Sequence, residues 1–363
     1  MRSCSPRAER DALRGIRRAC DSAFDSATLR RAIAAHASRV IPSDAHFLNA
    51  LDPDTGLLTH VMGNGTAGLL DTFLGSLYPG GEAERVIALA QSGRVVTTQS
   101  SPRFASALRE FGFRHEVRAT FAVDDEPWGL WCALRAPGAP PFGDRETTFL
   151  RRIAPWVARG LRSAALLAAA AHADPGSAGA GACTMPGVLV IDSRGHVTQR
   201  TGMAAAQLAD LADEMGTTAE LPSPILGVLA RQRVACLAGA AHTDELRVHG
   251  RSGRWYAIRA ALTEPDAGGC SSSVVIITPL ARAEVAPLLA RLYGLSPRER
   301  EVVSLAARGH ATKSIAARMG ISAYTVQDHL DHASERVGVR GRRALLAKLF
   351  FDGYAEELER ASL

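Results

Sequence analysis

The sequence predicts a multidomain chain in which two α+β units are followed by an all-α domain of four helices. Short strand-like runs and helical segments alternate in two blocks, residues 27–170 and 187–280, and a segment rich in Gly, Ala and Pro separates them at residues 171–186. Over residues 295–351 apolar side chains recur at helical spacing. A chain of 363 residues is long enough for two or three domains, each with its own core.

The first α+β unit is predicted over residues 27–170, after an N-terminal extension at residues 1–26. Its elements are expected in the order helix, two strands, helix, irregular stretch, β-hairpin and closing helix. The first helix is expected over residues 27–40, the two strands over residues 45–50 and 57–62, the second helix over residues 82–92, and the irregular stretch begins with residues 95–99. The hairpin is expected to pair residues 116–123 with 127–135. The closing helix is expected from Asp144, because Phe149, Leu150, Ile153, Trp156, Val157 and Leu161 recur at helical spacing. This order resembles a GAF domain.

The second unit is predicted over residues 187–280, after the linker at residues 171–186. A strand pair opens it, a partly helical middle follows, and three strands close it. The expected strands are residues 187–192, 196–200, 244–249, 255–263 and 273–278. The opening strand pair and the strand order resemble a PAS-like sensor unit, and a connecting helix is expected over residues 281–294.

Both resemblances imply an input region that senses a small molecule, because GAF and PAS folds commonly enclose a pocket. The sequence names neither the ligand nor the residues that would bind it. His36, His46, His60 and His115 do not predict haem, since isolated histidines are more often surface or hydrogen-bonded core groups and no CxxCH is present.

The last domain opens with a strong helix start. Ser296 can cap the helix, Pro297 suits its first position and Glu299 completes a capping box. Gly309 offers the left-handed residue at which this helix stops. A short second helix is expected over residues 312–319 with Thr312 as its cap, because Ala311 cannot cap with a side-chain oxygen.

A tight turn at Gly320 and a cap at Ser322 predict a third helix close behind the second. One face of this third helix is apolar, while the other carries polar and acidic side chains. The apolar face comprises Val326, Leu330, Ala333 and Val337, and the outward face comprises Gln327, Asp328, Asp331 and Glu335. Two helices joined in this way can place the second of them in the major groove of DNA.

Several motif pieces occur in the order typical of the LuxR-type family, which this domain resembles. They are LSPRERE at the start, Lys313-Ser314-Ile315-Ala316, Gly320-Ile321-Ser322, Thr325-Val326 followed by His329, and Val337-Gly338-Val339 before a basic loop. The resemblance implies a LuxR-type helix-turn-helix domain over residues 295–351, followed by a tail at residues 352–363. It also implies that Lys313 touches a phosphate and that the third helix reads DNA.

The predicted DNA-binding residues come from the second helix, the turn, the third helix and the basic loop. They are Lys313, Ser322, Tyr324, Thr325, Gln327, Asp328, Asp331, Arg340, Arg342 and Arg343. The resemblance further implies that a fourth helix, residues 342–351, pairs the subunits of a homodimer. Its predicted dimerisation residues are Leu345, Leu346, Leu349 and Phe350.

Charge supports double-stranded DNA as a partner, but it also keeps an alternative open. Residues 296–351 contain ten Lys or Arg and five Asp or Glu, so the whole net charge of +5 lies there. The third helix is nevertheless acidic. Gln can pair with adenine and Asp can accept from cytosine, whereas a degenerate domain that has lost DNA would leave a signalling or protein-interaction module.

No arrangement of residues predicts an enzyme, a metal site or a nucleotide site. His115-Glu116 begins like HExxH, but Ala119 stands where the second histidine is needed. The six cysteines are scattered without the short spacing of metal ligands. Both lysines of the chain, Lys313 and Lys348, lie in the last domain, so the upstream residues cannot supply the lysine that a Walker A loop or a receiver domain needs. Residues 63–68 spell GxGxxG, for which a flexible loop is the ordinary interpretation.

The chain is expected to be a cytoplasmic regulator that does not enter the membrane. The N-terminus is rich in Arg and lacks the apolar core of a signal peptide. The longest apolar run, residues 164–171, is far shorter than the ~20 residues that span a bilayer.

Overall fold

The computed structural model describes residues 5–22, 25–64, 95–97, 108–171, 185–212, 221–237, 245–264 and 271–350. The predicted helix over residues 82–92 and tail at residues 352–363 lie outside these ranges, as does most of the predicted linker. The chain forms two compact units. The first comprises Met1–Ala164, Thr184–Ser252 and Tyr256–Pro279, and the second comprises Ala165–Cys183, Gly253–Trp255 and Leu280–Leu363.

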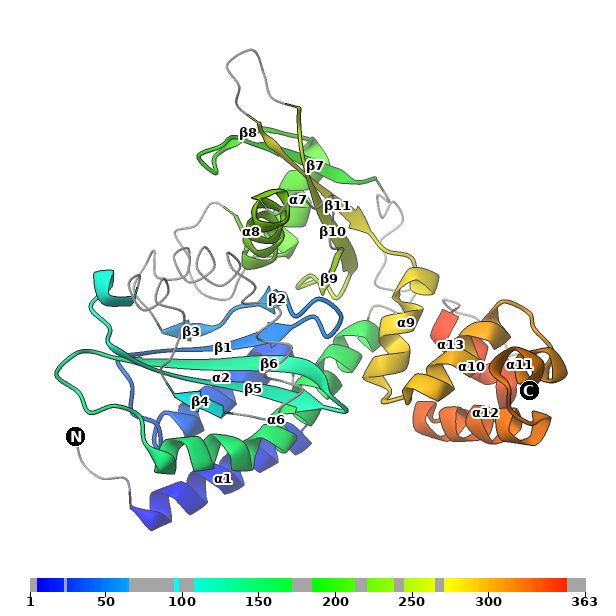
Figure 1. Cartoon of the computed structure of the whole chain (residues 1–363), viewed down its shortest axis with the longest axis horizontal. Helices are drawn as coiled ribbons and strands as arrows, with labels where there is room; N and C mark the ends of the chain where they lie inside the picture. The colour runs from blue at the N-terminus through cyan, green and yellow to red at the C-terminus, as the bar shows by residue number, and fades with distance from the viewer. Residues whose placement is uncertain are drawn as a thin grey trace. The chain divides into compact units, whose positions relative to one another are not determined.

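An antiparallel sheet organises the N-terminal part of the first unit (Figure 1). Its strands run in the order β2-β1-β6-β5-β4, and β3 also pairs with β1. The strands are β1 (Ala45–Leu51), β2 (Leu58–His60), β3 (Gly63–Asn64), β4 (Val95–Thr97), β5 (His115–Val123) and β6 (Glu126–Arg135). The predicted hairpin is confirmed: β5 and β6 pair from His115 and Arg135 to Val123 and Glu126, with one irregularity after Phe121, and the turn residues Asp124 and Asp125 have φ angles of 55° and 62° that suit a two-residue turn.

Helices cover one face of this sheet. They are α1 (Pro6–Asp21), α2 (Ser26–Ala37) and α6 (Asp144–Ala171), and the last confirms the predicted closing helix. A Cβ on Gly129 of β6 would lie 2.4 Å from Leu161 Cδ1 of α6, so glycine is what allows α6 to approach the sheet. Helix, hairpins and closing helix give the GAF-like α+β architecture that the sequence predicts.

The N-terminal extension contains a helix that the sequence did not predict: residues 6–21 form α1 and pack against α2. The Arg content of this segment hides an apolar stripe at helical spacing. Ala12, Leu13, Ile16 and Ala19 are buried on that stripe. Arginines occupy the other face of the helix, so a segment that reads as polar in composition is amphipathic in structure.

The GxGxxG segment does not have the geometry of a dinucleotide loop where the structure describes it. Gly63 and Asn64 form β3, which pairs antiparallel with His46 and Phe47 of β1. A dinucleotide site needs a buried parallel strand before the loop. Residues 65–68 lie outside the described ranges.

A second antiparallel sheet of five strands forms the rest of the first unit, in the order β8-β7-β11-β10-β9. Its strands are β7 (Gly187–Ile191), β8 (Val197–Arg200), β9 (Leu246–His249), β10 (Trp255–Leu262) and β11 (Ser273–Pro279), with α7 (Gly202–Asp210) and α8 (Ser223–Leu237) between β8 and β9. All five predicted strands are present. The PAS-like designation of this sheet stays a prediction.

The second unit is helical where the structure describes it after Leu280. It contains α9 (Arg282–Leu292), α10 (Pro297–Ala307), α11 (Thr312–Met319), α12 (Ala323–Val337) and α13 (Gly341–Phe350) (Figure 1). Helix α9 occupies the range predicted for a connecting helix. Among the described helices, none has the length and apolar character needed to cross a membrane.

Candidate nucleic-acid interface

Helix α10 begins with the predicted capping box. The Glu299 amide donates to Ser296 Oγ at 3.3 Å, and the Ser296 amide donates to Glu299 Oε2 at 2.7 Å. Val302, Val303 and Ala306 are buried on its inner face. Gly309, with φ of 86°, ends the helix, so α10 forms a scaffold of fixed length.

Helix α11 begins at Thr312, so its N-cap is the preceding residue, Ala311. Ala311 makes no side-chain hydrogen bond to the helix. The expectation that Thr312 caps this helix is therefore wrong. Gly320 follows with φ of 66°, and the Ile321 amide donates to Ala316 O at 3.1 Å, which makes the tight turn between α11 and α12.

Helix α12 begins at Ser322, whose hydroxyl oxygen accepts from the Thr325 amide at 3.0 Å and lies 2.8 Å from Thr325 Oγ1. Val326, Leu330, Ala333 and Val337 are buried, which confirms the predicted inner face. On the other face Tyr324 is 78% exposed. An aromatic side chain so exposed beside a helix start suits contact with a partner surface.

A hydrogen bond joins two of the predicted DNA-binding residues on the outer face of α12. Gln327 Nε2 donates to Asp331 Oδ1 at 3.0 Å. The i, i+4 spacing in the sequence could have predicted this contact. This bond uses one of the two N–H groups of the Gln327 amide, so the other N–H and the amide oxygen remain for a partner.

Exposed basic side chains lie on both sides of α12 in the sequence, and α12 itself carries Arg336 in its last turn. Lys313 on α11 and Arg340 and Arg343 after α12 are exposed. Arg342 is half-buried, and its Nη2 donates to Ala306 O at 3.1 Å and His310 O at 2.7 Å. This guanidinium ties the start of α13 to the end of α10, a role that the sequence analysis missed.

The predicted dimerisation residues on α13 divide into two pairs. Leu345 and Leu349 are each 0% exposed within the domain, so they belong to its own core. Leu346 and Phe350 are partly exposed at i, i+4 spacing. Of the four residues, these two are therefore the ones available to another subunit.

Replacing Ser322 with Ala is expected to destabilise α12 by about 0.5–2 kcal/mol, because the substitution removes the acceptor for the Thr325 amide. Hydrogen exchange at the first turn of α12 in the full chain would measure the loss. Ser322→Asn is the matched control, since Asn caps as well as Ser, and it should restore protection. Equal protection in the Ala and Asn variants would show that the cap does not order this helix.

Known proteins place this domain in a family. The model described as bacterial regulatory proteins, luxR family, matches residues 294–349. The spore germination protein GerE of Bacillus subtilis is 39% identical over 62 residues, which make up 17% of this chain and 84% of GerE. The chain belongs to the LuxR family. The predicted LuxR-type helix-turn-helix domain, and the DNA-binding and transcription-regulating class it implies, are supported by this match.

The other similarities cover different shares of the chain. The transcriptional regulatory protein UhpA of Escherichia coli is 36% identical over 95 residues, which make up 26% of this chain and 44% of UhpA. A GAF domain from an Acinetobacter phosphoenolpyruvate-protein phosphotransferase aligns with 42% of this chain and 92% of its own length, at 13% identity and a TM-score of 0.31.

Proposed function

We propose that this protein is a cytoplasmic, sequence-specific transcription regulator that binds double-stranded DNA through α12 and is controlled by its first unit. The observation that carries the proposal is the α11–turn–α12 arrangement in a LuxR-family domain, with the inner face of α12 buried and Tyr324 and Gln327 exposed on its outer face. A helix held in this way can enter the major groove and present its N-terminal half to base edges.

The proposed contacts are of two kinds, contacts with phosphates and contacts with bases. Lys313, Arg340 and Arg343 would neutralise phosphates, and they set position without reading sequence. Tyr324, Thr325, Gln327, Asp328 and Asp331 would face the bases. Ser322 and Arg342 already hold the domain together through backbone contacts. Any contact they make with DNA would be added to those roles.

A homodimer would give the domain two half-sites. Leu346 and Phe350 of α13 are the apolar side chains left at the surface for pairing. Two-fold pairing predicts an inverted repeat as the operator. The first unit, with its GAF-like and proposed PAS-like sheets, would supply the ligand-dependent control by favouring one arrangement of the two DNA-binding domains.

Selection of genomic fragments by the purified protein, followed by sequencing, tests this function at two salt concentrations. We expect an enriched inverted repeat whose retention falls as salt rises, because phosphate contacts release counterions. Lys313→Ala should weaken all sequences alike and reduce the salt slope by about 1, whereas Gln327→Ala should change the preferred bases. Unaltered base preference in the Gln327 variant would remove α12 from the reading role.

The acidic outer face of α12 favours one rival function. A domain whose third helix repels phosphates could serve as a protein-interaction module within a signalling protein. A protein-interaction function predicts no DNA enrichment at either salt concentration. That result would make protein interaction, in place of DNA binding, the function of the last domain.

A further inference from the structure

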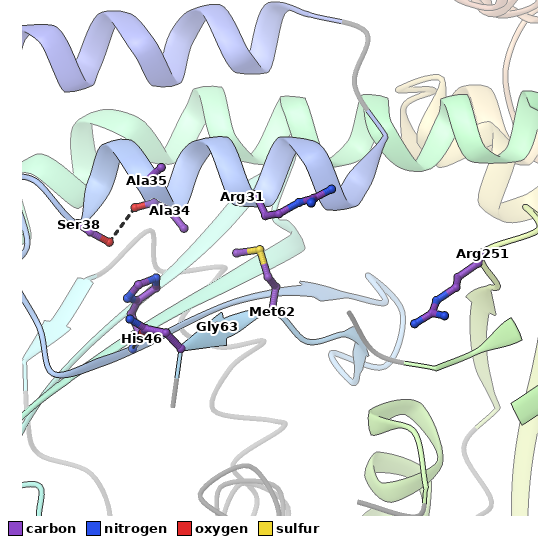
Figure 2. A pocket seen from close by; sticks show the side chains of 9 residues that line it. Arg31, Ala34, Ala35, Ser38, His46, Met62, Gly63 and Arg251 are labelled. Atoms are coloured by element: carbon purple, nitrogen blue, oxygen red, sulfur yellow. Dashed lines mark hydrogen bonds between the residues drawn. The ribbon is translucent and has the colours of Figure 1, made fainter. Parts of the chain in front are cut away.

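The first unit contains a cavity of about 630 Å³ between α2 and the β1–β3 edge of its first sheet. Figure 2 shows its lining, with Arg31, Ala34 and Ala35 on α2, Ser38 just after it, and His46, Met62 and Gly63 below them. Asn64 and Arg251 complete the wall. The volume lies within the ~300–1,000 Å³ typical of small-molecule sites.

Positive charge distinguishes this cavity. Arg31 and Arg251 line it, and the described residues of the lining include no Asp or Glu. Arg31 donates at 3.4 Å to Ala27 O and at 3.3 Å to Thr28 Oγ1, both on its own helix, and within the described part of the chain it forms no ion pair with a carboxylate. A guanidinium at a concave site attracts an anion.

His46 adds a fixed hydrogen-bonding group. Its ring stacks on Trp131, with centroids 5.3 Å apart and planes 9° from parallel. Burial lowers the pKa of His46, which favours the neutral imidazole. A neutral imidazole offers one donor and one acceptor, and His46 is among the residues that line the cavity.

The remaining wall is small and apolar. Ala34, Ala35 and Met62 supply carbon surface. Gly63 cannot carry a side chain here, because a Cβ would lie 2.2 Å from His46 O. Asn64 Oδ1 accepts from the His46 amide at 2.9 Å, so the Asn64 side-chain NH₂ is the group left to donate. Charge, donors and carbon surface therefore lie within one cavity.

We propose that this cavity binds a small organic carboxylate, with its negative group at Arg31 and Arg251 and its apolar body against Ala34, Ala35 and Met62. The inference deepens the proposed control by the first unit and rests on that part of the proposed function. It does not depend on α12 binding DNA. The ligand class follows from the two arginines of the lining together with its apolar wall.

Isothermal titration calorimetry of the full chain with benzoate tests the proposal. Benzamide is the neutral probe of the same shape, and sulfate is an anion that has no apolar part. We expect benzoate to bind with a Kd of about 1 mM or tighter and benzamide and sulfate at least about tenfold more weakly. Arg31→Ala should weaken benzoate by about tenfold. Ala35→Leu should abolish binding by filling the cavity, and it disturbs no core because Ala35 is exposed.

Arg39→Ala is the matched control, because Arg39 is exposed just beyond α2 and does not line the cavity. Its benzoate affinity should equal that of the wild type. No benzoate binding at about 10 mM, equal affinity for benzamide or sulfate, or unchanged binding in both Arg31→Ala and Ala35→Leu would overturn the proposal. DNA retention measured on the same variants without benzoate should match the wild type, so failure of this site is separable from failure of DNA binding.

Discussion

Arg135→Met is expected to destabilise the first unit by about 3–5 kcal/mol, because it removes one partner of a buried ion pair. Arg135 is 2% exposed, and its guanidinium lies 2.9 Å from Glu146 Oε1. It also donates to Pro42 O at 2.8 Å, Pro140 O at 3.0 Å and Pro141 O at 3.2 Å. The side chain therefore joins the entry to β1, the end of β6 and the start of α6.

The fate of Glu146 explains the size of the effect. Burial acts to raise the pKa of Glu146, but hydrogen bonds from Arg135 and the Gly143 amide outweigh burial, so its pKa is lowered. A lowered folded-state pKa means that this contribution to stability is present at neutral pH and is lost as pH falls through the acidic range. In Arg135→Met the carboxylate would keep its partial burial and lose its charged partner.

Hydrogen exchange on β6 and β1 in the full chain would measure the loss region by region. Arg145→Met is the matched control, since the Arg145 side chain is 39% exposed and lies 3.5 Å from Glu9; it should cost no more than about 1 kcal/mol. Arg135→Lys should be nearly as harmful as Met, because an ammonium cannot reach four acceptors in the guanidinium plane. Wild-type protection in Arg135→Met would contradict the role assigned here.

The elements that the sequence predicted correctly are those determined by residues close together in the chain. The α10 capping box and the Gly320 turn depend on residues within five positions of each other, so their structure follows directly from the residue types. The same holds for the β5–β6 hairpin. Helix α1 was not predicted. Its Arg-rich composition obscures the helical spacing of the apolar residues Leu13 and Ile16.

Contacts between distant residues could not be predicted. Arg342 was assigned to DNA from its charge, yet its guanidinium reaches Ala306 O and His310 O more than thirty positions away. Leu345 and Leu349 appeared equivalent to Leu346 as apolar residues of one helix. Only the packing of the domain shows that the first two are fully buried. The cavity at Arg31 likewise requires a sheet register that places His46 beside Gly63 and Asn64.

The double substitution Asp328→Asn with Asp331→Asn is expected to raise DNA affinity by at least about tenfold at low salt, because it removes two negative charges from the helix proposed to approach phosphates. The gain should shrink as salt rises, since screening weakens charge repulsion. Fluorescence anisotropy with a selected operator at two salt concentrations would measure it. Glu335→Gln, at the far end of α12, is the control and should change affinity less.

Single substitutions at Asp331 separate charge from orientation. Asn retains an acceptor for Gln327 Nε2, so Asp331→Asn should raise affinity and change the preferred bases less than Asp331→Ala does. Ala removes that acceptor and releases the Gln327 amide, so Asp331→Ala should alter base preference as well as affinity. If neither variant changes affinity or preference, the outer face of α12 does not lie against DNA, and the acidic helix belongs to a protein-interaction surface instead.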